Sequence, residues 1–300
     1  MNLKKPLWAE GLNSETESAS SSSSSSTTPV GELVSSLNKQ RIYREVTLAL
    51  RTGLRDASAE FSFLRVRGLR NLLKFLRSVA ESESAIRLFS HSQSVRELQV
   101  LPVLFENSFK QSKDDPIPNL DHIFSVEPMK ITSPSTDTEI ALALRVLEGC
   151  CLLHRGSTAS AHQFNAIKVL MNILSTRGVL ERGACLDAFI SIMLDSSTNQ
   201  MDFEACRGID KVAKLMKDKQ ADEDIRLKCG EFLLLFIGHI NSRERPPKLR
   251  VHEDIRRLLG ERSASLIWAA SQFGSTLDPE QRQTALHIQA RRVLESLEMY

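Results

Sequence analysis

The feature that most constrains the fold is a helical pattern that occurs three times between positions 140 and 240. The three segments begin at Ala143, Ala184 and Ile225, so that their starts lie 41 residues apart (184 − 143 and 225 − 184). They are apolar at five matched offsets, and the first three offsets are spaced by four residues, which makes a stripe on one helix face. The matched sets are Ala143/Ala184/Ile225, Leu147/Ala188/Cys229, Cys151/Ile192/Leu233, Leu152/Met193/Leu234 and Leu153/Leu194/Leu235.

A shorter amphipathic helix is predicted after each of these long helices. Its apolar positions follow an i, i+3, i+4 spacing and are Leu170/Val212/Ile255, Ile173/Leu215/Leu258 and Leu174/Met216/Leu259. Helical units that recur at about 40–47 residues are typical of armadillo and HEAT proteins, because a helix pair buries its apolar face only by stacking on its neighbours. We therefore predict an all-α fold, an armadillo/HEAT-like α-solenoid of about 40-residue helical repeats. The alternative is an irregular helical domain in which similar helices recur by chance.

The composition divides the chain into a tail and one helical domain. Residues 1–31 contain an unbroken run of serines and little to bury, which predicts a disordered tail. Residues 32–300 are expected to form a single armadillo-like domain. Within it, residues 111–139 carry four prolines and no helical period, which predicts a long mobile loop. This loop contains Ser133-Pro134, a minimal site for proline-directed phosphorylation, although such dipeptides are common by chance.

Helices are also predicted on both sides of this loop. One or two helices run from about residue 32 and close around Gly53. The next helix covers residues 61–82, and a helix pair over 84–110 is interrupted by Pro102. After the loop, the stretch from Thr136 to Glu139 fits a capping box at the start of the first strong repeat.

Overall charge and cysteine content indicate a protein of a reducing compartment. The net charge is +2 with 25% charged residues, which implies neither a nucleic acid nor a membrane surface as partner. The five cysteines are an odd number and no secretory signal precedes them, so we expect buried, reduced thiols. No apolar run approaches the roughly 18 residues of a membrane span. A cytoplasmic location is expected, with the nucleus as the alternative.

No sequence pattern predicts catalysis or a cofactor. The glycines form neither a phosphate-binding loop nor a nucleophile elbow. A cysteine phosphatase needs an arginine six residues after its thiolate, and none of the five cysteines has one. Cys150, Cys151 and His154 form the only Cys/His cluster, which we interpret as core packing rather than zinc because no second ligand pair exists. Catalytic, cofactor-binding and metal-ligating residues are therefore not predicted.

One region is strongly basic. Residues 39–77 hold ten basic residues against three acidic ones. In the helix at 61–82, one face is apolar (Leu69, Leu72, Leu73, Leu76). The opposite face carries four cations, called the basic stripe below: Arg67, Arg70, Lys74 and Arg77. The stripe is predicted to bind a partner, an acidic protein surface ahead of phosphates, because the rest of the chain is not basic. A solvated face whose long side chains cover apolar area is an equal alternative.

Three blocks resemble a known family: 64–105, 148–174 ("EGCCLLHRGSTASAHQFNAIKVLMNIL") and 208–237. Over roughly residues 40–270 the chain is similar to the septation-initiation-network components called cell division control protein fourteen, which are unrelated to the phosphatase of that name. The resemblance implies an armadillo-type protein without enzymatic activity. It also implies binding to a Ste20-like (germinal-centre-type) protein kinase in septation and cytokinesis, and association with the division site or cytoskeleton. The family supplies no binding motif, so it implies no site residue.

Three other functions stay open at this point. The chain can be a general armadillo-like adaptor without a kinase partner, which affinity purification would distinguish. It can be a helical-repeat protein that binds nucleic acid through residues 39–77, in which case binding weakens steeply with salt. An enzyme with an unrecognised site is the last alternative. The oligomeric state is not predicted.

Overall fold

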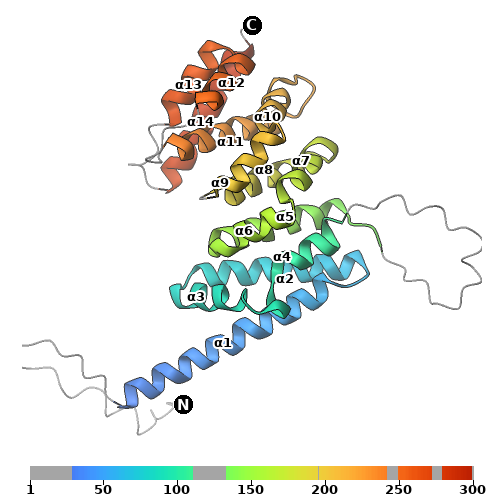
Figure 1. Ribbon diagram of the computed structural model, residues 1–300, viewed down its shortest axis with the longest axis vertical. Helices are drawn as coiled ribbons and strands as arrows, with labels where there is room; N and C mark the ends of the chain where they lie inside the picture. Colours follow the sequence, from blue (N-terminus) through green and yellow to red (C-terminus); the bar gives the residue numbers. More distant parts are fainter. Residues whose placement is uncertain (1–28, 111–132, 195, 242–248, 272–278, 299–300) are drawn as a thin grey trace, which may run out of the picture. The chain divides into compact units, whose positions relative to one another are not determined.

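The computed structural model describes residues 29–110, 133–194, 196–241, 249–271 and 279–298. Within these ranges the regular elements are helices and no strand occurs (Figure 1), which confirms the all-α prediction for the described part of the chain. The predicted tail up to residue 28 and the predicted loop from 111 to 132 lie outside the described residues. The α-helices are α1 (Pro29–Ala57), α2 (Ser62–Ala80), α3 (Glu83–Ser92), α4 (Val100–Val103), α5 (Asp137–Leu153), α6 (Arg155–Gln163), α7 (Ala166–Thr176), α8 (Val179–Met193), α9 (Ser197–Ala205), α10 (Gly208–Lys217), α11 (Glu223–Asn241), α12 (Leu249–Leu259), α13 (Glu261–Ser271) and α14 (Pro279–Glu298).

By its internal contacts the chain divides into two units, Met1–Arg41 and Ile42–Tyr300. The described part of the first unit is the N-terminal portion of α1, which begins at Pro29, within the predicted tail. Proline is favoured at such a first helical position. The apolar side chains of this portion follow one helix face and are exposed: Val30, Leu33, Val34 and Leu37. The second unit contains the core described below, and the prediction of a single domain over 32–300 stays a prediction.

Two glycines allow α1 and α2 to pack closely within the second unit. The first helix does not close around Gly53 as predicted but continues to Ala57. A Cβ atom on Gly68 would lie 2.4 Å from the backbone nitrogen of Ala57, and one on Gly53 would lie 2.6 Å from the Leu72 side chain. Glycine is needed where two backbones approach this closely. Gly53 is therefore a packing residue and not a helix end.

The predicted helix pair over 84–110 is broken, but not by Pro102. α3 ends at Ser92, and a short 3-10 helix, η2 (Arg96–Leu98), separates it from α4. Pro102 lies in the first turn of α4, where a missing backbone N–H costs nothing because it has no intrahelical partner. The chain continues from α4 into a π-helix, η3 (Leu104–Ser108).

The predicted apolar stripe of the repeats lies in the core. The stripe belongs to α5, α8 and α11, and the nine residues of its first three matched sets are each 6% exposed or less. The two remaining sets are not core positions throughout, since Leu152, Leu194 and Leu235 are 57%, 36% and 44% exposed. The four-residue spacing thus identified the buried face, whereas the two remaining sets mix buried residues, such as Met193 and Leu234, with exposed ones.

The first two repeated units each contain three helices where two were predicted. The additional helices are α6 and α9, nine residues each. Each is followed by a residue in the left-handed conformation, Asn165 (φ 53°) and Arg207 (φ 52°), and these lie 42 residues apart (207 − 165). The extra helices have few apolar residues to bury, which is why hydrophobic periodicity did not reveal them.

Equivalent core positions of the first two repeated units carry side chains of different size. Phe203 of α9 is fully buried among the rings of Phe189, Phe232 and Phe236, with centroids 5.4–5.7 Å away. A Cβ atom on Gly208 would lie 2.3 Å from the Phe203 ring. At the positions 42 residues earlier the chain carries two fully buried alanines, Ala161 and Ala166. A large side chain therefore faces a glycine in one unit, and two small side chains occupy the other.

The long helices pack against one another in chain order. α5 contacts α2 and α8, and α11 contacts α8 and α14 (Figure 1). α12 packs between α10 and α13 and is followed by Gly260, whose φ of +86° lies in the region that favours glycine.

Candidate protein-interaction surface

The basic stripe lies on the exposed side of α2. Its four cations are all exposed, whereas Leu69, Leu72 and Leu76 on the opposite face are buried and Leu73 is half-buried. The predicted assignment of the two faces is thus confirmed, and the partner-binding role stays a prediction. Among the residues that the structure describes, Arg70, Lys74 and Arg77 have no ion-pair partner.

Arg67 differs from the other three cations because it has a partner within the fold. Its Nε donates a hydrogen bond to Oδ2 of the buried Asp56, at 2.8 Å. This hydrogen bond, and the positive charges of Arg67 and Arg55, lower the pKa of Asp56 against the opposing effect of burial. Arg67 therefore links α2 to the end of α1, and the cations free to meet a partner are Arg70, Lys74 and Arg77.

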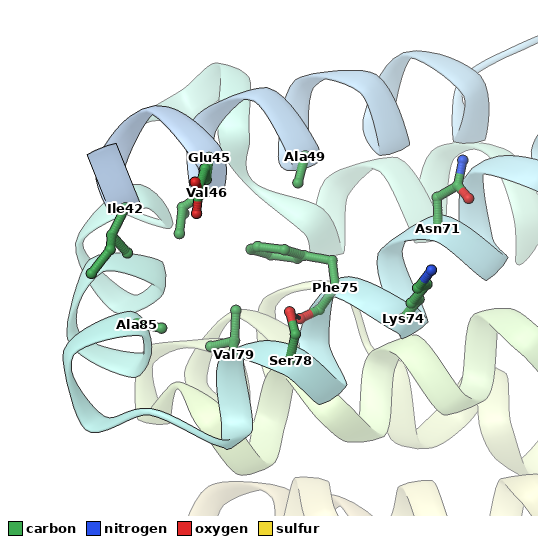
Figure 2. A pocket seen from close by; sticks show the side chains of 10 residues that line it. All are labelled: Ile42, Glu45, Val46, Ala49, Asn71, Lys74, Phe75, Ser78, Val79 and Ala85. Carbon is green, nitrogen blue, oxygen red and sulfur yellow. Dashed lines mark hydrogen bonds between the residues drawn. The ribbon is translucent and has the colours of Figure 1, made fainter. Parts of the chain in front are cut away.

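A groove of about 410 Å³ opens beside the stripe, between α1, α2 and the start of α3. Its lining combines six apolar and four polar side chains: Ile42, Val46, Ala49, Phe75, Val79 and Ala85, with Glu45, Asn71, Lys74 and Ser78. Figure 2 shows Phe75 extending from α2 toward Val46 of α1, with Lys74 and Asn71 toward one end of the groove. A volume of this size can accept a few side chains of a partner.

Lys74 belongs to both the groove and the basic stripe. Arg70 and Arg77 lie one helical turn before and after it on the same face of α2. Apolar contact and positive charge are therefore adjacent on this surface. The sequence alone did not predict the groove, because its walls come from three helices and depend on how they pack.

Arg65, which the sequence counts with the basic region, is not part of the surface. It is 4% exposed, and its Nε donates to Oε1 of the fully buried Glu139 at 2.7 Å. Thr136 is the N-cap of α5 and accepts from the Glu139 backbone N–H, as predicted. The Glu139 side chain, however, is held by Arg65 and by the hydroxyl of Ser62 at 2.7 Å. This ion pair joins α2 to α5 and is structural.

A second polar surface crosses the long helices of the repeats, and we call it the charge ladder: Arg145, Glu148, Asp187, Lys228, Glu231 and His287. Asp187 of α8 lies 2.7 Å from Arg145 of α5 and 2.9 Å from Lys228 of α11. Glu231, which lies 3.4 Å from Lys228, is 3.1 Å from Nδ1 of His287 on α14. The charged groups of the ladder thus have partners within it, in contrast to the three cations on α2.

The pKa values of Glu148 and Lys228 in the ladder are both raised, although burial acts on them in opposite directions. Burial raises the pKa of Glu148, and the hydrogen bond and charge of Arg145 only partly offset this. Burial alone would lower the pKa of Lys228, but its hydrogen bonds and attraction to Asp187 and Glu231 outweigh it and raise the value.

The Cys150, Cys151 and His154 cluster lies at the end of α5. Burial raises the pKa of Cys150 well above its ordinary value and that of Cys151 to about 12, so both thiols are protonated and unreactive at neutral pH. Burial lowers the pKa of His154, whose Nδ1 lies 3.0 Å from the Ser157 hydroxyl.

Within the described ranges, no three His, Cys, Asp or Glu side chains gather in a way that could hold a metal. None of the described helices has the length and apolar character needed to cross a membrane.

No curated protein and no solved structure shows a significant match. A family model described as Cell division control protein 14, SIN component, matches residues 119–290, which is more than half of the 300 residues. The matched stretch contains the charge ladder, and the basic stripe lies N-terminal to it. The chain belongs to the cell division control protein 14 family of septation initiation network components.

Proposed function

We propose that this protein is a non-catalytic scaffold or regulatory subunit that binds a Ste20-like protein kinase in septation signalling. Family membership supports a role in septation, and the resemblance of the sequence to this family implies the kinase. We also propose that the packing order α2, α5, α8, α11 with three-helix repeated units is an armadillo-like solenoid. Such a fold serves binding, since stacked repeats offer an extended surface.

The proposed binding site rests on one observation, the groove beside three cations that have no ion-pair partner in the described structure. Its apolar lining can accept the anchor side chains of an amphipathic helix. Arg70, Lys74 and Arg77 then favour acidic residues on the same partner helix, because complementary charges speed encounter and fix orientation. The partner segment is therefore an amphipathic, acidic helix of the kinase. The charge ladder is less suited to this role, because its charges have partners within the chain.

A cytoplasmic location, with recruitment to the division site or cytoskeleton, follows from this role. The nucleus is the alternative, and a kinase confined there would favour it. Fluorescent tagging during septation distinguishes the two.

The test is a binding titration of the full chain with a Ste20-like kinase of the septation pathway, with kinase activity followed in parallel. The test variant reverses the three stripe cations that have no ion-pair partner in the described structure (Arg70→Glu, Lys74→Glu, Arg77→Glu). Arg67 is left intact because it holds Asp56. A control variant makes the same charge change on other exposed lysines (Lys211→Glu, Lys214→Glu, Lys219→Glu).

We expect saturable one-to-one binding by the wild type and a loss of at least about tenfold in affinity for the stripe variant, which is about 1.4 kcal/mol. The control variant should bind like the wild type. No binding by the wild type would reject the kinase partner and favour a general adaptor. Equal binding by all three proteins would place the kinase on another surface.

A further inference from the structure

Ser133 joins the segment before α5 to the turn between α1 and α2. Its backbone N–H donates to the Glu60 carbonyl at 3.0 Å. Its hydroxyl accepts from the backbone N–H of Ser62 at 2.5 Å and donates to the Glu60 carbonyl at 3.4 Å. Residues 133–136 form no helix, Ser133 is half-buried and Pro134 is exposed. A single hydroxyl thus connects two segments that are 71 residues apart in sequence.

Arg65 of α2 also contacts this segment, and each N–H of its guanidinium already donates a hydrogen bond. Its Nη2 donates to the Ser133 carbonyl at 2.8 Å and to Glu139 at 3.1 Å. Its Nη1 donates to the carbonyls of Ala59 and Glu60, and its Nε to Glu139. A guanidinium has five N–H donors, and all five are used here.

We propose that Ser133 is a phosphorylation site for a proline-directed protein kinase and that the phosphate opens the junction between the segment before α5 and α2. Pro134 follows Ser133 directly, whereas the third residue after Ser133 is Thr136 and not a basic residue. The proline is therefore the recognition element. In the reaction the Ser133 oxygen attacks the γ-phosphorus of ATP. The new O–P bond forms as the bond to ADP breaks, and the hydroxyl proton passes to the kinase's catalytic base.

The phosphate opens the junction because the site is arranged for a neutral hydroxyl. A phosphate adds nearly two negative charges and cannot donate to the Glu60 carbonyl. The phosphate also lies close to the buried carboxylate of Glu139, because Arg65 donates both to that carboxylate and to the Ser133 carbonyl. Arg65 can bind the phosphate only by giving up Glu139 or a carbonyl, and a buried carboxylate without its cation is unstable. The Ser62 N–H at the positive end of α2 compensates only in part.

The experiment treats the full chain with a mitogen-activated protein kinase and ATP and maps the phosphates by mass spectrometry. The chain has two Ser/Thr-Pro pairs, Thr28-Pro29 and Ser133-Pro134. A Thr28→Ala background therefore isolates the proposed site. Pro134→Ala removes the recognition element at an exposed position outside the helices and leaves the hydroxyl in place.

We expect one phosphate on Ser133, which Pro134→Ala and Ser133→Ala both abolish. In the phosphorylated chain, hydrogen exchange of the amides at residues 62–65 should be at least tenfold faster, with exchange in α8 and α11 unchanged. Absence of phosphate from Ser133, with Thr28 modified in the wild type, would overturn the site. Phosphate on Ser133 with unchanged or slower exchange would overturn the opening of the junction. Neither outcome depends on whether the protein binds a Ste20-like kinase.

Discussion

Ion pairs connect neighbouring helices both at the α2–α5 junction and along α5, α8 and α11 of the repeats. The pair at the junction is buried, whereas those of the repeats lie near the surface. The junction uses the buried pair of Arg65 and Glu139, which are 4% and 0% exposed. The repeats use the charge ladder, in which Asp187 is shared by Arg145 and Lys228 near the surface. A buried charge that loses its partner is strongly destabilising, whereas a surface pair contributes little. The chain therefore depends on one specific pair at the junction and on apolar packing in the repeats.

The same contrast separates the surfaces available to a partner. In the repeats, charged side chains at the ladder satisfy one another across helices. On α2, Arg65 and Arg67 are used within the fold, and Arg70, Lys74 and Arg77 are left without partners in the described structure. The N-terminal helices thus have free positive charge next to an apolar groove.

The largest expected effect is at the junction. Arg65→Leu leaves the Glu139 carboxylate buried without a cation, which should lower the free energy of unfolding by about 3–5 kcal/mol. The double variant Arg65→Leu, Glu139→Leu should be more stable than Arg65→Leu, because no buried charge remains. Urea denaturation of both variants and the wild type measures this. A single variant as stable as the wild type would show that the pair is solvated.

The next effect distinguishes the two repeated units. Gly208→Ala places a Cβ atom against the Phe203 ring, 2.3 Å away, and should cost about 1–3 kcal/mol because the ring is held by three others. The control is Ala166→Gly at the matched position, which removes a fully buried methyl group and some helix propensity, each worth roughly 1 kcal/mol, but introduces no clash. Adding Phe203→Ala should remove most of the additional penalty of Gly208→Ala in a double-mutant cycle. Additive effects in that cycle would contradict the steric explanation.

The charge ladder should tolerate substitution. Asp187→Asn removes the shared carboxylate of Arg145 and Lys228, and since its side chain is 20% exposed we expect a loss of about 0.5–1 kcal/mol. The loss should shrink in high salt, because surface charges are screened. Thermal denaturation at two ionic strengths provides the measurement. A loss near that of Arg65→Leu would mean that the ladder, too, holds the repeats together.

The smallest effect concerns Arg67 and pH. The folded pKa of Asp56 is lowered, so this carboxylate stabilises the fold above its unfolded pKa, near 3.8, and the contribution is lost as pH falls through the folded pKa. Arg67→Ala should raise the pKa of Asp56 and reduce the acid-dependent part of stability, with little change in the groove. Carboxyl NMR titration of Asp56 follows this directly. An unchanged pKa of Asp56 in the Arg67→Ala variant would mean that Arg67 does not serve Asp56 and belongs with the cations available to a partner.

The sequence predicted the elements whose burial follows from local spacing. The stripe from Ala143 through Leu147 to Cys151 is buried because a four-residue period specifies one face whatever packs against it. α6 and α9 were missed because short polar helices carry no such period. A signal for the ladder was present, since the oppositely charged Arg145 and Asp187 lie 42 residues apart (187 − 145), close to the repeat.

The candidate site was predictable only in part. Spacing placed Arg67, Arg70, Lys74 and Arg77 on one exposed face. It could not separate Arg65 from them, because the burial of Arg65 is decided by Glu139, 74 residues away. The groove depends on the packing of α1, α2 and α3, which no local pattern specifies.

The most direct test of partner binding is hydroxyl-radical footprinting of the full chain with and without the Ste20-like kinase. It compares side-chain oxidation at Ile42 and Phe75 of the groove with oxidation at Leu152 and Leu235, which are exposed on the long helices of the repeats. We predict that the kinase protects Ile42 and Phe75 severalfold and leaves the two leucines unchanged. Protection of Leu152 and Leu235 with unchanged oxidation in the groove would contradict binding at α1 and α2 and would assign the partner to the repeats.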